Sequence, residues 1–333
     1  MRLGVPTRIL GRRGLRAYDT RRPQSAPHLS VSLAHLHDVF AYLASINTSF
    51  YRLASDLAPY STHPALTQFH HQIEACAIEL AAVGLVARRQ GLRLSMHAPL
   101  HVHLAAHDPA TVQRSCEVLE LLTTLLDGMR LDADAVIVVH VGGGVDAGSG
   151  GFDGVLSRWV ARFERLPVRV QRRLVLEHED DGASLGMALR VHAATGVPLV
   201  FDYLHFRLNN PERWSLPEAL AVALATWPHD RTPKLHFASP RTELRAVERD
   251  DPHTGRRRWL LSPPRPGHHA DFLNPWEFAE FVQAAAYVRD FDIMLEAKAA
   301  DLALLRLRAD LQSYVPEVAS WLGAPSLPAT VLE

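Results

Sequence analysis

The chain has 333 residues, 47% of them hydrophobic, with a formal net charge of -1 and a pI of about 7.0. This length suits one large domain or two ordinary ones, and the neutral charge excludes a histone-like coat protein but not an enzyme with a local basic patch. Two cysteines, Cys76 and Cys116, indicate a reducing compartment rather than a disulfide framework. No signal peptide or apolar run of membrane-spanning length is visible, so we expect a cytoplasmic protein with no membrane partner.

Short apolar runs rich in β-branched residues recur along the chain and predict eight strands. In chain order they are Arg2–Val5, Ser49–Leu53, Leu92–His97, Ala135–His140, Leu174–Glu177, Leu199–Asp202, Pro233–Phe237 and Asp292–Glu296. Longer segments carry apolar residues at every third or fourth position and predict eight helices. These cover Leu29–Ile46, Ala65–Gln90, Pro109–Gly128, Phe152–Leu166, Ser184–Thr195, Leu216–Thr226, Pro275–Tyr287 and Leu302–Leu322.

The alternation of strands and helices predicts an α/β fold with a parallel sheet covered by helices. Eight such units match a single-domain (β/α)8 TIM barrel over residues 1–322, followed by a C-terminal tail at 323–333. Two connections are longer than a simple loop. Gly142–Gly154 is rich in glycine, and the segment after the seventh strand predicts an inserted hairpin with strands at Thr242–Arg249 and Arg256–Leu261. Both connections follow strands, so we expect both on the catalytic face.

Side chains that can bind a metal ion stand at or next to the ends of predicted strands three to eight, where barrel enzymes keep their active sites. They are His97, His140, Glu177, Asp202, His236 and Glu296. His205, three residues after Asp202, and His269, after the predicted hairpin, make eight candidate ligands, and His63 follows the second strand. Because one catalytic ion commonly takes three protein ligands, eight predict two or three ions. Nitrogen and oxygen ligands fit Mn, Zn or Fe(II).

Lys234 precedes His236 by two residues, so both side chains should lie on the same face of the strand. A lysine directed at a metal cluster must be paired, neutral or modified, because a buried unpaired ammonium is costly. Two outcomes stay open at this point. Lys234 forms a salt bridge with Glu177 or Glu296, or its amine is neutral or covalently modified.

The motifs at these strand ends resemble those of the UV damage endonuclease family, which belongs with endonuclease IV among the xylose-isomerase-like barrels. They are Ser61-Thr62-His63-Pro64, Leu94-Ser95-Met96-His97, Val139-His140-Val141-Gly142-Gly143, Leu176-Glu177, Phe201-Asp202-Tyr203-Leu204-His205, Lys234-Leu235-His236-Phe237-Ala238-Ser239 and Leu295-Glu296-Ala297-Lys298. The resemblance implies up to three ions, often manganese, held by the eight candidate ligands. It also implies catalytic roles for Glu177 and His63, and a carboxylated lysine at Lys234 that reaches a metal.

The implied reaction is incision of damaged duplex DNA immediately 5′ to a UV photoproduct, leaving a 3′-hydroxyl and a 5′-phosphate. We expect a monomer with no obligate protein partner. The chain departs from the family at the third strand, where Pro-Gly-Gln-Tyr typically follows the histidine and this sequence has Ala98-Pro99-Leu100-His101. It also has Gly4-Val5-Pro6 in place of the family's Gly-Tyr-Pro, and no early Asn. These changes predict retained metal chemistry with altered lesion recognition, in which Leu100 and His101 stack or wedge.

The inserted hairpin carries a second group of candidate substrate-binding residues. Arg256, Arg257 and Arg258 place three cations beside the ring of Trp259, a combination that suits contact with nucleotides. The competing interpretation of this segment is a charged, solvated flap.

Two other interpretations stay open. One is a single-metal sugar isomerase or epimerase that uses Glu177, Asp202, His236 and Glu296, and the other is a non-catalytic DNA-binding relative. His97, His140, His205 and His269 argue against the first, because a single ion does not need them. We expect His178 to lie on the opposite face of its strand from Glu177, away from the site.

Overall fold

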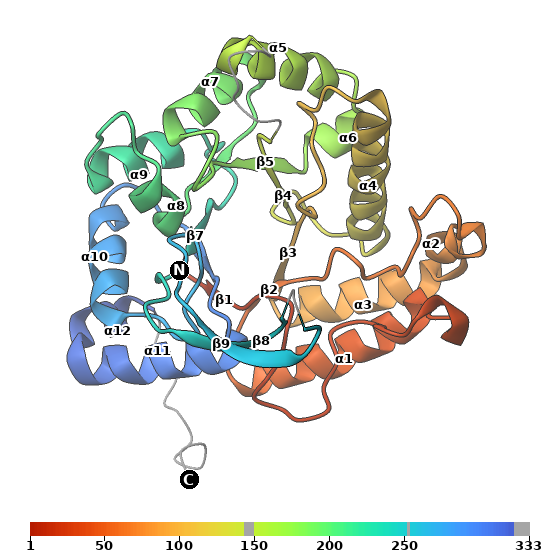
Figure 1. Cartoon of the computed structure of the whole chain (residues 1–333), viewed down its shortest axis with the longest axis horizontal. Coiled ribbons are helices and arrows are strands. Elements are labelled where there is room, and N and C mark those ends of the chain that lie inside the picture. The colour runs from red at the N-terminus through yellow and green to blue at the C-terminus, as the bar shows by residue number, and fades with distance from the viewer. Residues whose placement is uncertain (143–149, 252–253, 323–333) are drawn as a thin grey trace.

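Eight parallel strands occupy the centre of the described structure, with helices around them (Figure 1). The computed structural model describes residues 1–142, 150–251 and 254–322. The parallel strands are β1 (Leu3–Gly4), β2 (Phe50–Arg52), β3 (Arg93–His97), β4 (Ile137–His140), β5 (Leu174–Glu177), β6 (Leu199–Val200), β7 (Lys234–Phe237) and β10 (Asp292–Leu295). The predicted α/β fold with a parallel sheet is confirmed, and the structure places a strand within each of the eight predicted runs.

The strands pair in two groups that meet at both ends. One sheet has the order β1-β10-β7, and the other has the order β2-β3-β4-β5-β6. An isolated parallel bridge joins Val5 to Tyr51, and another joins Asp202 to His236. The carboxyl ends of all eight strands therefore lie at the same end of the molecule, where their last side chains can meet.

Helices follow the strands along the chain and cover them from outside (Figure 1). They are α1 (Leu29–Ser45), α2 (Gln72–Ala75), α3 (Ala77–Arg89), α4 (Pro109–Gly128), α5 (Gly151–Phe163), α6 (Val168–Gln171), α7 (Leu185–Thr195), α8 (Tyr203–Leu208), α9 (Leu216–Ala225), α10 (Pro275–Ala285), α11 (Ala300–Tyr314) and α12 (Pro316–Trp321). Short 3-10 turns lie at Pro23–Ser25 and Thr67–Phe69. No helix in the described ranges is both long and apolar enough to cross a membrane.

Two predicted helices were wrong as single elements. The segment predicted as Ala65–Gln90 is a 3-10 turn followed by α2 and α3, with a break at Cys76, whose φ of -108° and ψ of 21° leave the helical region. The segment predicted as Leu302–Leu322 divides into α11 and α12 at Val315. Pro316 explains the second break, because a proline disfavours helical geometry in the residue before it.

The apolar pattern that predicts the strands also explains their burial. Ile137, Val138 and Val139 of β4 are all buried, as expected for a strand covered on both faces. Two helices begin at a side-chain N-cap, because the Asp108 side chain accepts two backbone N–H bonds at the start of α4 and the Asn274 side chain does the same for α10.

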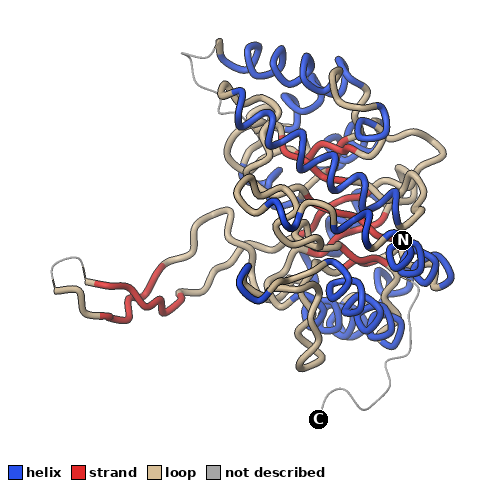
Figure 2. Tube along the Cα trace, turned by 90° about the vertical axis from the view of Figure 1, so that its right-hand side faces the viewer, coloured by secondary structure: helices blue, strands red, loops and turns tan. Residues whose placement is uncertain are grey.

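Strands β8 (Arg245–Asp250) and β9 (Arg257–Ser262) form an antiparallel ribbon between β7 and α10. Figure 2 shows this ribbon extending away from the body of the molecule. Both strands begin later than predicted, at Arg245 and Arg257 rather than Thr242 and Arg256. Most of the glycine-rich loop (143–149) and the predicted tail (323–333) lie outside the described residues.

Candidate active site

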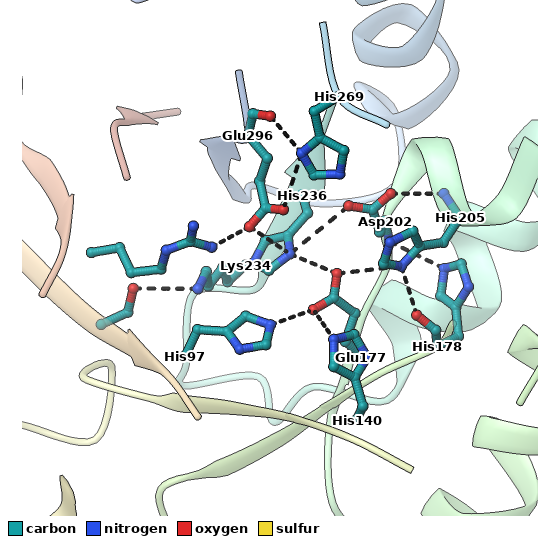
Figure 3. A network of polar contacts seen from close by, with 12 residues as sticks. His97, His140, Glu177, His178, Asp202, His205, Lys234, His236, His269 and Glu296 are labelled. Atoms are coloured by element: carbon teal, nitrogen blue, oxygen red, sulfur yellow. Dashed lines mark hydrogen bonds and ion pairs between the residues drawn. The ribbon is translucent and has the colours of Figure 1, made fainter. Parts of the chain in front are cut away.

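Glu177 is buried and stands at the centre of a group of histidines at the carboxyl ends of the strands (Figure 3). One of its carboxylate oxygens, Oε2, lies 3.0 Å from His97 Nε2 and 3.7 Å from His140 Nε2. The other, Oε1, lies 2.8 Å from His236 Nδ1 and 3.6 Å from His205 Nδ1. The two oxygens of one carboxylate thus face two different pairs of histidines.

The network continues from His236 to two further carboxylates. His236 Nδ1 lies 3.9 Å from Asp202 Oδ2 and 3.5 Å from Glu296 Oε1. Glu296 Oε2 in turn lies 3.9 Å from His269 Nδ1. The structure therefore brings all eight candidate ligands, which belong to separate segments of the chain, into one polar network (Figure 3).

Backbone carbonyls orient three of the histidine rings. Nδ1 of His97 donates to the Ala98 carbonyl at 2.8 Å, and Nδ1 of His269 donates to the Glu296 carbonyl at 2.7 Å. Nδ1 of His205 donates to the His178 carbonyl at 2.9 Å. Hydrogen bonds of this kind fix the tautomer of a metal-binding histidine and leave Nε2 as the ligand atom.

Several polar atoms of the network are buried and have no hydrogen-bond partner in the described structure. They include His236 Nε2, His140 Nδ1 and Asp202 Oδ2. Buried polar atoms are normally satisfied, so the unpartnered Asp202 Oδ2, which faces His236 within the network, fits a bound cation. Two sets of three ligand atoms lie within 4.8 Å of one another, namely His97, His140 and Glu177, and Glu177, Asp202 and His236. The residues present thus fit a metal centre built around Glu177.

The electrostatics of the site favour the ionised form of Glu177 and the protonated form of His205. Burial raises the pKa of Glu177, but His236 and His140 outweigh burial and hold that pKa well below its usual value. Burial also opposes protonation of His205, yet the nearby Asp202 and Glu177 carboxylates raise the pKa of His205 to about 9. Without an ion, the positive charge that balances these carboxylates resides partly on His205.

Lys234 is completely buried, and its Nζ lies 3.3 Å from Ser95 Oγ. Among the described residues, Nζ forms no ion pair with Glu177 or Glu296, so that alternative from the sequence is not found. Glu296 is instead paired with Arg52 at the end of β2. Burial, followed by the charge of Arg52, lowers the pKa of Lys234 well below its usual value.

The remaining candidates from the sequence lie around the network rather than in it. A cavity of about 400 Å³ opens onto the site and is lined by His97, Glu177, His269, Glu296 and Leu100. A neighbouring cavity of about 470 Å³ shares Ser55 and Pro99 with the first and is lined by His63 and His101. Arg256, Arg257, Arg258 and Trp259 are exposed on or beside the ribbon strand β9.

Sequence reasoning dismissed His178, which the structure places next to the ligands. Strand β5 ends at Glu177, so the alternation of faces does not apply to His178. Its buried Nε2 accepts the backbone N–H of Asp202 at 3.1 Å, and its carbonyl accepts from His205. Burial, followed by the charge of His205, lowers the pKa of His178 to about 3, which keeps the ring neutral.

Arg52 was also missed, although it occupies the end of the second strand as the ligands occupy the ends of later ones. The prediction considered only side chains that commonly bind metal ions, and arginine is not one of them. The signal for Arg52 in the sequence is a charged residue at the end of a strand.

Comparison with known proteins places the chain among DNA repair enzymes. A family model described as UV-endonuclease UvdE matches residues 21–322, a range that contains all eight candidate ligands. The UV DNA damage endonuclease of Halalkalibacterium halodurans is 29% identical over 293 residues, which cover 85% of this chain and 82% of that protein. The resemblance predicted from the motifs is therefore confirmed.

Solved structures agree with this match. The crystal structure of SacUVDE has a TM-score of 0.77 and 26% identity and covers 94% of this chain and 98% of its own. Endonuclease IV from Thermus thermophilus has a TM-score of 0.55 and 14% identity over 94% of this chain and 100% of its own, which shows a shared fold.

Proposed function

We propose that this chain, which belongs to the UV-endonuclease UvdE family, is a metal-dependent endonuclease that hydrolyses a phosphodiester of damaged DNA. The observation that carries the proposal is the convergence of eight His, Asp and Glu side chains, including Glu177 at their centre, with a buried, unpartnered carboxylate oxygen of Asp202 among them. The family match does not favour the alternative of a single-metal sugar isomerase. A non-catalytic role would leave so complete a set of ligands without a use.

We infer that the eight residues hold two or three divalent ions, with manganese the expected metal. Such ions, when bound, would supply Lewis-acid stabilisation of negative charge on a phosphate and make water a stronger nucleophile. Glu177 would help to hold these ions together with the histidines on both sides of it, because its Oε2 faces His97 and His140 while its Oε1 faces His236 and His205.

His63 fits a contact with the substrate better than a place among the ligands. The described residues show no contact between His63 and the network, and the side chain is exposed at the neighbouring cavity. Its Nδ1 accepts the backbone N–H of Ala65 at 3.2 Å. The neutral ring therefore carries its proton on Nε2, from which it can donate to a nucleotide.

Lys234 supports the proposed carboxylation. Its amine is buried, has no carboxylate partner in the described part of the chain, and has a strongly lowered pKa. A neutral Nζ can form a bond to the carbon of CO2 with loss of one proton to solvent, which leaves a carbamate. The added oxygens would then extend from β7 toward the ligands, which fits the face that Lys234 shares with His236.

We also propose that residues 1–322 form one domain whose eight strands close into a (β/α)8 barrel. The bridges Val5–Tyr51 and Asp202–His236 support closure, because they join the two sheets on both sides. Action as a cytoplasmic monomer stays a prediction.

The ribbon β8–β9 is the part of the protein that we propose to contact duplex DNA outside the cavity. A two-stranded ribbon fits the width of a major groove. Arg249 lies directly opposite Arg258 across the ribbon, and the Asp251 carboxylate, 3.2 Å from Arg258, offsets only one of these two like charges. The Trp259 side chain next to Arg258 is 69% exposed and offers a ring for stacking.

Incision immediately 5′ to a photoproduct is the finer activity that we propose from the family. In this chain Leu100, 77% exposed at the mouth of the site cavity, and His101 in the neighbouring cavity take the positions of the family's Gln and Tyr. We propose that Leu100 wedges between bases and that His101 stacks, without the hydrogen bonds of a glutamine.

Nicking of supercoiled plasmid by the purified protein with Mn2+ tests the function. We expect conversion to the open circle for UV-irradiated plasmid and much less for untreated plasmid. Equal cutting of both would show a general nuclease and refute lesion specificity. A protein that binds two or more ions per chain but cuts neither plasmid would refute the proposed function.

A further inference from the structure

Arg52 is the one guanidinium or ammonium group among the described residues that line the site cavity. It is the last residue of β2, and its side chain is 19% exposed. Its only described side-chain partner is Glu296, which Nη1 contacts. A guanidinium has five N–H donors, so most of those of Arg52 are not used by this contact.

The free donors of Arg52 are directed into accessible space. None of its nitrogen atoms is among the buried atoms of the described structure that have no partner. Because these atoms are neither bonded within the described chain nor sealed from solvent, they reach the cavity that contains His97, Glu177 and Glu296. A group that only neutralised Glu296 would be expected to use both arms of its fork on that carboxylate.

The backbone of Arg52 is held firmly. Its N–H donates to the Val5 carbonyl at 3.1 Å, and its carbonyl accepts the Thr7 hydroxyl at 3.1 Å. The next N–H, of Leu53, donates to the Ser95 carbonyl at 2.9 Å. These bonds hold the base of the side chain, and the contact with Glu296 holds one arm of the guanidinium. Donors held in place need little reorganisation when an anion arrives, which is the condition under which they stabilise developing charge most strongly.

The charges around the site also favour a contact between Arg52 and a phosphate. The network holds three carboxylates, those of Glu177, Asp202 and Glu296, which repel a phosphodiester. Arg52 approaches from the end of β2, the strand beside β3, which carries His97. We propose that Arg52 binds a non-bridging oxygen of the scissile phosphate through the donors that Glu296 leaves free. This assignment rests on the proposed function and names the residue that holds the reacting group.

The test compares two duplexes that differ in one charge. One carries an ordinary phosphate at the incision position and the other a neutral methylphosphonate, and binding is measured with Ca2+ in place of Mn2+, after checking that no incision occurs. We expect the wild-type protein to bind the methylphosphonate duplex about tenfold more weakly. Arg52→Gln should lose most of this difference, and Arg52→Lys should recover part of it because the charge returns without the fork.

Arg207→Gln is the matched control, since Arg207 is also an arginine paired with a glutamate, Glu277, at 2.6 Å but does not line the site cavity. It should behave as the wild type. Metal content of Arg52→Gln should stay at the wild-type level, which separates loss of a phosphate contact from loss of Glu296 as a ligand. An equal methylphosphonate penalty in wild type and Arg52→Gln would overturn the assignment of Arg52 alone.

A wild-type protein that binds neither duplex would instead refute the proposed function. In that case, binding of inorganic phosphate to the metal-loaded protein tests the assignment of Arg52. Weaker phosphate binding by Arg52→Gln than by wild type and Arg207→Gln supports the assignment, and equal binding by all three overturns it.

Discussion

His236 and Glu177 are joined by a contact of 2.8 Å between Nδ1 and Oε1, and both side chains are almost completely buried. The contact links β7 to β5 across the centre of the strands, so it sets the distance between the two halves of the ligand network. Each of the two compact ligand groups includes Glu177. Substitution of this carboxylate therefore tests the whole site.

Glu177→Gln should abolish incision and reduce bound metal by at least one ion per chain. The amide keeps the shape of the side chain but carries no negative charge to share between His97 and His236. Metal content by mass spectrometry and plasmid nicking measure the two effects. Glu277→Gln, which changes a partly exposed carboxylate paired with Arg207, is the control and should retain both metal and activity. Full metal occupancy and normal turnover in Glu177→Gln would refute the assignment of the site.

His178 gives a second prediction, because it supports two ligands without being one. His178→Leu leaves the buried N–H of Asp202 without an acceptor, so we expect the free energy of unfolding to fall by about 1–3 kcal/mol. Metal affinity should fall by about 10- to 100-fold, as for other residues that orient ligands.

His178→Asn is the matched variant, since its side-chain oxygen can still accept a hydrogen bond. It should recover part of the metal affinity that His178→Leu loses. Urea unfolding and metal titration of both variants provide the measurements. A loss of stability with unchanged metal affinity would mean that His178 is only a packing residue.

Much of the fold and site could be predicted from the sequence because strand ends and chemistry coincide. His97, His140 and Glu177 each end a strand whose apolar run is visible, so the positions of their side chains followed from the parallel order. His178 could not be placed in this way. Its position depends on strand β5 ending at Glu177, one residue before His178. It also depends on the hydrogen bond that His205 of α8 donates to the His178 carbonyl.

Other features depend on contacts between distant segments. The partner of Glu296 is Arg52, 244 residues earlier in the chain, and no local pattern distinguishes it from the partner expected at Lys234. The break at Cys76 was also not predicted. The apolar residues around it are spaced as in a single helix, but the backbone leaves the helical region at Cys76 and divides the segment into α2 and α3.

Asp19 predicts a pH dependence of stability away from the site. Its carboxylate, 1% exposed, accepts hydrogen bonds from the Arg21 side chain and from the His28 backbone. The Arg21 bond outweighs the effect of burial and lowers the pKa of Asp19 to about 2. A lowered folded-state pKa stabilises the native state above the unfolded-state value near pH 4, and this stabilisation is lost as the pH falls toward 2.

Asp19→Asn should therefore lower the free energy of unfolding by about 1–2 kcal/mol at pH 7. The difference in this free energy between the wild type and the variant should be smaller by about 1 kcal/mol at pH 3. Urea denaturation at the two pH values measures it. The control is Asp56→Asn. Asp56 is exposed and, like Asp19, lines the cavity that contains His63, and its substitution should lower the free energy of unfolding by no more than about 0.5 kcal/mol at either pH. A gap for Asp19→Asn that is the same at pH 7 and pH 3 would contradict the ion-pair explanation.

The two faces of the ribbon allow a prediction about DNA binding. Arg249 and Arg258 share one face, whereas Arg257 belongs to the other and lies 3.6 Å from Glu248 and 3.9 Å from Asp250. Arg258 is paired with the Asp251 carboxylate at 3.2 Å, but it also lies opposite Arg249, for which the described residues show no carboxylate partner. The face with two cations and one carboxylate therefore has more positive charge to offer a phosphate than Arg257, which lies near two carboxylates. The three arginines predicted together from the sequence should therefore contribute unequally.

Replacing Arg249 and Arg258 together by Gln should weaken binding of duplex DNA and reduce the slope of log affinity against log salt by about one to two. Arg257→Gln, the matched control on the opposite face, should change the slope by less than half as much. Fluorescence anisotropy with a labelled duplex at several salt concentrations gives these slopes. Retained metal content and cutting at low salt would locate the defect in binding. If the double variant and Arg257→Gln have the same slope as the wild type, the ribbon is a solvated flap and makes no contact with DNA.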